Sequence, residues 1–246
     1  MKNIITISLL ATVLSSFGST YETQDQFSIN LPDAWVEIPK DVLDEFSENV
    51  SKLAPQNPKQ IYDYGYQLNE SDGWLQYPYI LVQVKNVGRV ASGELKQYKK
   101  IEKGFTEGLD QVNDSFSDIM SNASFGETVY DEGNHILWTT ISMDVEGSGK
   151  VKAVVAVKLT EKGIIQFNAY ATEATFDEYA QIYRNAFINL NIDESIAYKP
   201  QLTDSAPVIG GINTGKVLSA GIRGAIIGGI IGLFAWVGKK KKKKDS

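Results

Sequence analysis

Apolar and polar residues alternate along much of the chain, as expected for strands with one buried face. In 151–159, Val151, Val155 and Leu159 belong to one apolar face, while Val154 and Ala156 make the opposite face apolar as well. A strand of this kind belongs in the centre of a covered sheet. Shorter alternating runs, bounded by Gly, Pro, Asn or Asp, predict further strands. These are expected at 26–30, 35–38, 61–68, 78–86, 125–131, 136–143 and 164–170, the first two as a hairpin around Leu31-Pro32-Asp33.

Three segments carry apolar residues at helical spacing. The first lies between Pro39 and Pro55 and places Leu43, Phe46 and Val50 on one face. The second and longest, 93–120, repeats large apolar residues every seven positions and is preceded by Ser92, a plausible N-cap. The third, 176–190, follows Thr175-x-x-Glu178, which has the form of a capping box.

This order of elements predicts an α+β fold. It begins with a strand pair and a helix, continues through two strands and the long helix, and ends with four strands and a last helix. The simplest arrangement is an antiparallel sheet with helices on both faces, which gives three layers.

Both ends of the chain carry signals for export and membrane insertion. Residues 1–19 have a charged start at Lys2 followed by an apolar stretch, as in a secretory signal peptide. Residues 217–238 form an apolar stretch of about 30 Å as a helix, close to the hydrocarbon thickness of a bilayer. A basic segment follows it and favours a cytoplasmic location for this end. Its lysines are Lys239, Lys240, Lys241, Lys242, Lys243 and Lys244.

The sequence therefore predicts five regions. A signal peptide (1–19) precedes an exported domain (20–192), a linker rich in polar residues, Pro and Gly (193–216), one transmembrane helix (217–238) and a cytoplasmic tail (239–246). The protein is expected at the cell membrane, crossing it once, with the N-terminal domain outside the cytoplasm and the C-terminal tail inside.

The exported part is strongly acidic. Residues 20–208 contain 15 Lys and Arg against 29 Asp and Glu, a net charge of −14, which the lysine tail masks in the whole-chain value of −6. Such a surface is unsuited to nucleic acid and should be repelled by anionic lipid headgroups. The chain has no cysteine, so disulfides, iron–sulfur clusters and cysteine-based zinc sites are excluded.

The sequence does not predict an enzyme, a cofactor or a metal site. His135 is the one histidine and follows a Gly133-Asn134 turn, where a polar residue is ordinary. There is no Gly-x-Ser-x-Gly nucleophile elbow for a Ser-His-Asp triad, and histidine-based zinc sites need more than one imidazole. Paired carboxylates occur at turns and in the first turn of a helix, where charge is expected.

Aromatic residues gather within one predicted hairpin, between Tyr62 and Tyr79. Tyr62, Tyr64 and Tyr66 alternate and are expected to pack on one side of their strand, beneath a helix. Trp74 and Tyr77 belong to the turn region, where a large side chain has less core to enter. We therefore hold two hypotheses for this pair: a partner-binding surface, because Tyr and Trp dominate binding hot spots, or an extension of the core.

The predicted membrane helix has small residues at a spacing of four. Gly224, Gly228 and Gly232 lie on one face, which would let a second transmembrane helix approach closely. This pattern predicts self-association or a membrane-protein partner. The alternative is that these glycines only fill space, since glycine is common in membrane helices.

Scattered apolar positions over residues 25–192 resemble the PsbP-like family of exported domains. They are Phe27-x-Ile29-x-x-Pro32-x-x-Trp35, Ile165-x-Phe167-x-Ala169 and Phe176-x-x-Tyr179, followed by Phe187. The resemblance implies the PsbP-like three-layer fold and a non-enzymatic accessory role in assembling or stabilising a membrane complex. The chain departs from the family in its C-terminal helical anchor, and it offers no functional motif of the family.

Taken together, these patterns favour a membrane-anchored accessory or binding module of a membrane or envelope complex. A second hypothesis is a cell-surface protein whose C-terminal helix and basic tail are a processed sorting signal; the mass of the mature protein separates the two. A hydrolase that uses scattered carboxylates is a third and weaker hypothesis.

Overall fold

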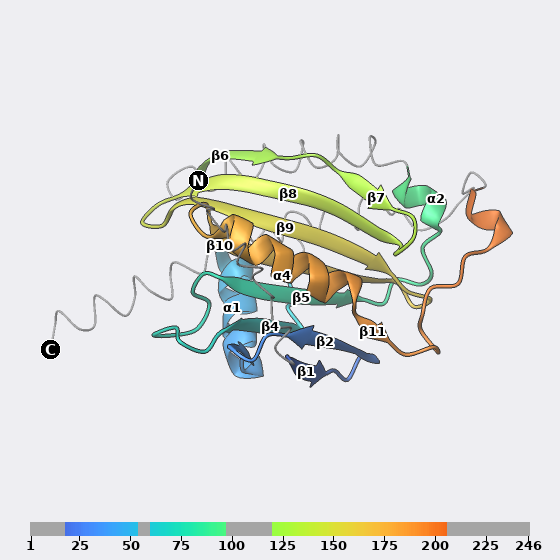
Figure 1. Cartoon of the computed structure of the whole chain (residues 1–246), viewed down its shortest axis with the longest axis horizontal. Coiled ribbons are helices and arrows are strands. Elements are labelled where there is room, and N and C mark those ends of the chain that lie inside the picture. Colours follow the sequence, from blue (N-terminus) through green and yellow to red (C-terminus); the bar gives the residue numbers. More distant parts are fainter. Residues whose placement is uncertain (1–17, 54–59, 97–119, 206–246) are drawn as a thin grey trace, which may run out of the picture.

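A computed structural model describes residues 18–53, 60–96 and 120–205 (Figure 1). In these residues, no helix combines the length and the apolar character of a membrane span. The helix predicted at 217–238 and the lysine tail lie outside them, and so does the predicted signal peptide except for its last two residues, Gly18 and Ser19, of which Ser19 begins a strand.

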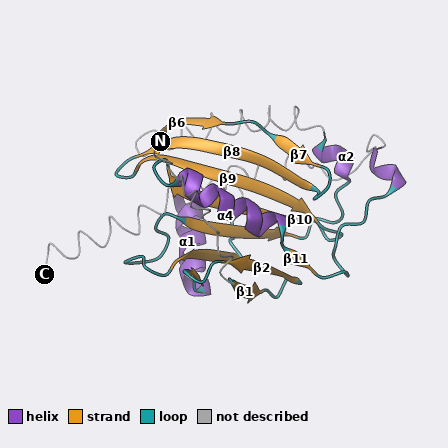
Figure 2. Ribbon diagram, viewed as in Figure 1, coloured by secondary structure: helices purple, strands orange, loops and turns teal. Residues whose placement is uncertain are grey.

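The main element is an eight-stranded antiparallel sheet, and strands make up most of the regular secondary structure of the described residues (Figure 2). The strand order is β3-β4-β5-β10-β9-β8-β6, and β7 pairs with β8 beside β6. The strands are β3 (Trp35–Glu37), β4 (Tyr64–Leu68), β5 (Tyr79–Lys85), β6 (Met120–Phe125), β7 (Val129–Asp131), β8 (Ile136–Val145), β9 (Gly149–Leu159) and β10 (Ile164–Thr172).

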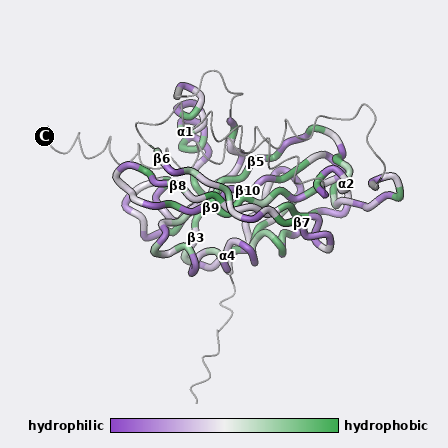
Figure 3. The backbone as a smooth tube through the Cα atoms, turned by 90° about the horizontal axis from the view of Figure 1, so that it is seen from above, coloured by the Kyte–Doolittle hydropathy of each residue, from purple (hydrophilic) through white to green (hydrophobic). Residues whose placement is uncertain are grey.

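Helices and a small second sheet cover the large sheet. The small sheet has the order β1-β2-β11 and consists of β1 (Ser19–Glu22), β2 (Phe27–Leu31) and β11 (Asn191–Ile192). Seen from above in Figure 3, α1 and α4 lie on opposite sides of the strands. The helical elements are α1 (Lys40–Leu53), α2 (Ser92–Leu95), α4 (Phe176–Ile188) and the 3₁₀ helix η1 (Leu202–Ser205).

Two apolar clusters, one on each face of the large sheet, hold these layers together. Leu43, Phe46 and Val50 of α1 belong to the first cluster, with one face of β9. Tyr183 and Phe187 of α4 belong to the second, together with the apolar side chains of β2 and the opposite face of β9. The prediction of a central, doubly covered strand at 151–159 is confirmed, and so are helices on both faces.

The predicted hairpin at 26–38 is wrong. β2 pairs with β1 and β11, whereas β3 pairs with β4 of the large sheet. The turn in which Trp35 N–H donates to the carbonyl oxygen of Pro32 (2.9 Å) carries the chain from one sheet to the other. Phe27, Ile29 and Leu31 can then pack onto the face of the large sheet instead of extending its edge.

The predicted boundaries around 93–131 also need correction. Within 93–120 the structure describes the short α2, whose N-cap is Ala91 rather than Ser92, and Met120, which begins β6 instead of ending a helix. Residues 97–119 lie outside the described chain. The single strand expected at 125–131 is divided: Phe125 ends β6, and Val129–Asp131 form β7, which pairs with β8 separately.

Two local predictions fail because side chains find other partners. Tyr62 precedes β4 and packs against Phe46 of α1, whereas Tyr66 packs against Tyr21 on the opposite side of the sheet. Tyr64 and Tyr66 share one side of β4 as expected, and only Tyr62 departs from the alternation, because the strand begins at Tyr64. Thr175 forms no capping hydrogen bond; its hydroxyl is 3.0 Å from that of Thr172.

Candidate functional site

A network of hydrogen bonds and ion pairs joins the C-terminal segment of the described chain, residues 193–205, to the domain. The guanidinium of Arg89 donates to both carboxylate oxygens of Asp204, at 2.7 and 2.9 Å. It also donates to Glu161 (Nε to Oε1, 3.2 Å) and to the carbonyl oxygen of Lys199 (2.8 Å). Only 5% of the Asp204 side chain and 20% of the Arg89 side chain are exposed. We call Arg89, Glu161, Tyr198 and Asp204 the clasp.

The surrounding groups fix the charge state of the clasp. The Arg89 guanidinium, a backbone N–H from Gln201 and the Tyr198 hydroxyl hold the pKa of Asp204 well below its usual range. Hydrogen bonds to Asp204 raise the pKa of Arg89. Both groups are therefore ionised at neutral pH, and their bidentate geometry is the strong form of an ion pair.

Backbone contacts extend the same attachment. Glu161 N–H donates to the carbonyl oxygen of Ile196 (2.9 Å), and Thr160 forms an isolated bridge with Ala197. Ile196 is buried at 3% exposure. The segment predicted as a linker from residue 193 is thus held to the domain by contacts that continue as far as Asp204, although Leu202 is fully exposed.

His135 is part of these surroundings. Its ring centroid is 4.9 Å from that of Tyr198, and its Nδ1 is 3.3 Å from the Tyr130 hydroxyl. Burial and the nearby Lys158 lower the pKa of His135, which favours a neutral imidazole at pH 7. These contacts explain the residue as a packing and hydrogen-bonding partner at the end of a turn.

Trp74 and Tyr77 are half-buried and pack against the first apolar cluster. Tyr77 stacks on Tyr79, with ring centroids 5.2 Å apart. The side-chain amide of Gln67 braces the loop, donating to the carbonyl oxygen of Gly73 (2.7 Å) and accepting from Leu75 N–H (2.6 Å). The pair thus contributes to the core, and its role in binding stays a prediction.

Replacing Trp74 with alanine is expected to lower the free energy of unfolding by about 1–2 kcal/mol. This is less than the cost for a fully buried aromatic side chain, because Trp74 is only half-buried. If the binding hypothesis is correct, the same variant also captures less partner. Chemical denaturation and partner capture with Trp74→Ala and Trp74→Phe test both points, since phenylalanine keeps most of the packing.

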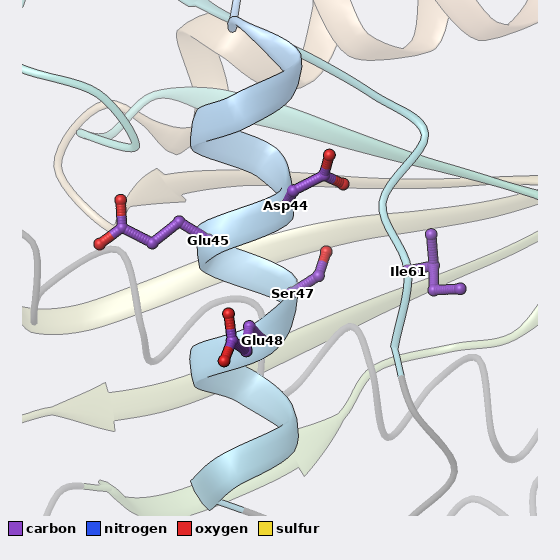
Figure 4. Close-up of a pocket in the computed structure, with 5 residues that line it drawn as sticks. All are labelled: Asp44, Glu45, Ser47, Glu48 and Ile61. Carbon is purple, nitrogen blue, oxygen red and sulfur yellow. The ribbon is translucent and has the colours of Figure 1, made fainter.

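A pocket of about 420 Å³ lies beside α1 and is lined by Asp44, Glu45, Ser47, Glu48 and Ile61 (Figure 4). Two of its carboxylates are paired within the helix, Asp44 with Lys40 and Glu48 with Lys52. The Ser47 hydroxyl donates to the Leu43 carbonyl oxygen and accepts from Tyr62 N–H. In the described part of the chain, no three His, Cys, Asp or Glu side chains are grouped to hold a metal ion.

The remaining predicted sites belong to the part of the chain after residue 205. Gly224, Gly228 and Gly232 lie outside the described residues, and so does the lysine segment 239–244. The clasp was missed from the sequence, because Arg89 and Asp204 are 115 residues apart and neither belongs to a recognisable motif.

No protein-family model matches the chain, and curated proteins give no match. Among solved structures, cyanobacterial PsbP (CyanoP) from Synechocystis sp. PCC 6803 is similar with a TM-score of 0.42 and 12% identity, over 74% of this chain and 96% of that one. LpqN of Mycobacterium tuberculosis, described as involved in cell envelope biogenesis, is similar with a TM-score of 0.35 and 14% identity, over 73% and 87%. The expected resemblance to a PsbP-like fold is thus found again among solved structures. At these scores it carries no argument about function.

Proposed function

We propose that this protein is an exported accessory module, anchored by one C-terminal transmembrane helix and acting by binding within a membrane or envelope complex. The observation that carries the proposal is the clasp, which attaches the last described residues before the predicted anchor firmly to the domain. A module that serves a membrane complex must be kept within reach of that complex. A firmly attached C-terminal segment does this.

The clasp shortens the distance by which the domain can move away from the membrane. A free linker over 193–216 would extend to about 80 Å, at roughly 3.3–3.6 Å per residue. With the chain held to the domain at Asp204, residues 205–216 reach only about 40 Å. This restraint acts against the repulsion between an acidic domain and anionic headgroups. It keeps the domain near membrane-embedded partners, for which Gly224, Gly228 and Gly232 offer a packing face.

The test is in-cell crosslinking and co-purification of the full-length protein and of a form that ends at Ser205, which retains every clasp residue. We expect the full-length protein to capture a defined membrane-protein partner and the shorter form to capture the same partner in lower yield, because it is no longer concentrated at the membrane. Equal capture by both forms would show that anchoring is irrelevant. The absence of any specific partner would contradict an accessory role.

A further inference from the structure

A groove lies where α4 stops covering the large sheet, between the C-terminal half of this helix and the β7–β8 pair. Figure 1 shows α4 lying across the middle strands while β8 and β7 extend beyond it. Val129 is directly opposite Trp138 in the β7–β8 register, and Asp131 is opposite Ile136, so these side chains point to the α4 face. The cavity has a volume of about 530 Å³. We call it the Trp138 groove; its lining includes Glu127, Val129, Asp131, Trp138, Arg184 and Ile188.

The groove exposes apolar surface in a domain that exposes little elsewhere. In the described residues, four large apolar side chains are exposed, and two of them, Val129 (46%) and Ile188 (36%), line this groove. Trp138 lies beneath, only 7% exposed and stacked on Phe187, with ring centroids 6.0 Å apart. The floor is therefore rigid, and its two exposed aliphatic side chains can gain free energy by being covered.

Charges at the rim distinguish possible occupants. Among the described residues, Glu127 and Arg184 form no ion pair, although both line the groove. Hydrogen bonds from Asn134 lower the pKa of Asp131, so this second carboxylate is ionised. The guanidinium of Arg184 lies over the Trp138 ring, 5.5 Å from its centroid. The charge of Lys158 also lowers the pKa of Asp131, but this lysine donates to the Asn134 carbonyl oxygen and does not line the groove. Of the charged side chains that line the groove, two are thus carboxylates and one is a cation that an aromatic face already stabilises.

We propose that the Trp138 groove binds an extended segment of a partner protein in which a large apolar residue lies next to lysine or arginine. The apolar side chain covers Val129 and Ile188, and the basic side chain pairs with Glu127 and Asp131. The net charge of −14 over residues 20–208 favours a basic partner at longer range as well. This inference rests on the proposed binding function and adds the chemistry of the partner.

The test is photo-crosslinking in cells that express the full-length protein, with p-benzoyl-phenylalanine replacing Val129 at the groove. A matched crosslinker replaces Glu146, an exposed residue in the turn between β8 and β9. Mass spectrometry of the crosslinked peptide identifies the partner segment. We expect crosslinks specific to position 129, to a segment with Lys or Arg within about three residues of a large apolar residue.

Charge variants separate this proposal from the general binding function. Glu127→Lys should lower the yield from position 129 about five- to tenfold, whereas Glu146→Lys should leave it unchanged. Arg184→Gln should raise the yield, because it removes the one cation of the groove. A fall with Arg184→Gln, crosslinks to an acidic segment, or crosslinks only to lipid would each overturn the proposal. A partner still captured by the full-length protein in that case would leave the accessory function standing.

Discussion

Replacing Asp204 with asparagine is expected to lower the free energy of unfolding by about 3 kcal/mol and to release the C-terminal segment from the domain. The asparagine side chain has the shape of aspartate and keeps one acceptor, but it cannot neutralise Arg89. The side chain of Asp204 is only 5% exposed, and removing one partner of a buried pair typically costs several kcal/mol. Arg89 then keeps a single, longer ion pair with Glu161 (3.2 Å), so its charge is only partly compensated. The arginine is 20% exposed and partly hydrated, which places the expected loss at the lower end of that range.

Hydrogen exchange separates release of the segment from general destabilisation. In the Asp204→Asn variant, amides of residues 191–205 should exchange faster, while those of β9 and β10 change only as far as global stability requires. Asp72→Asn is a matched control, because Asp72 is exposed in a loop. If exchange in 191–205 were the same in both variants, the clasp would not be what holds the segment.

The same pair gives a sign for the pH dependence. The pKa of Asp204 is lower in the folded protein than its unfolded value of about 4, so the clasp contributes fully above that value. Its contribution is lost as the pH falls from about 4 towards the folded pKa. The stability difference between the wild type and Asp204→Asn should therefore be constant near neutral pH and shrink only in this acidic range. A difference that disappeared already between pH 5 and 7 would point to another titrating group.

The strands that the sequence predicts best are those whose faces are decided locally. The alternation in 151–159 depends only on which side each residue faces, and β9 keeps that pattern over its whole length. The partners of β2 could not be predicted in this way, because β1 and β11 come from opposite ends of the described chain. Both are short and mostly polar, so the pattern contains little signal for them, and a neighbouring strand was assigned in their place.

The functional sites were hard to predict for the same reason: they depend on contacts between residues that are distant in the sequence. Trp74 and Tyr77 could be singled out by residue type, but only the packing shows that Gln67 holds their loop against the core. Asp204 looked like one more polar residue of a linker. Its role depends on Arg89, and a pairing over 115 residues cannot be inferred from spacing. Similarly, the Trp138 groove depends on where α4 stops covering the sheet, which is a property of packing rather than of sequence pattern.

Neighbouring residues of α4 should separate the stability of the domain from binding in the groove. Phe187 is 1% exposed and stacks on Phe167, with ring centroids 4.2 Å apart, and on Trp138. Truncating a buried phenylalanine leaves a cavity as well as lost contacts, so Phe187→Ala is expected to cost about 3–5 kcal/mol in the free energy of unfolding. Denaturant titration of the purified variant measures this loss.

Ile188 comes next in the chain but is 36% exposed and lines the Trp138 groove. Ile188→Ala should therefore cost less than about 1 kcal/mol in stability, since its side chain already contacts solvent. Its effect should appear in the crosslinking yield at position 129, because it removes apolar surface that the partner segment covers. If Ile188→Ala destabilised the domain as much as Phe187→Ala, the exposed side chain would be part of the core, and the apolar wall of the groove would have to be assigned differently. If it changed neither stability nor crosslinking, Ile188 would be ordinary surface.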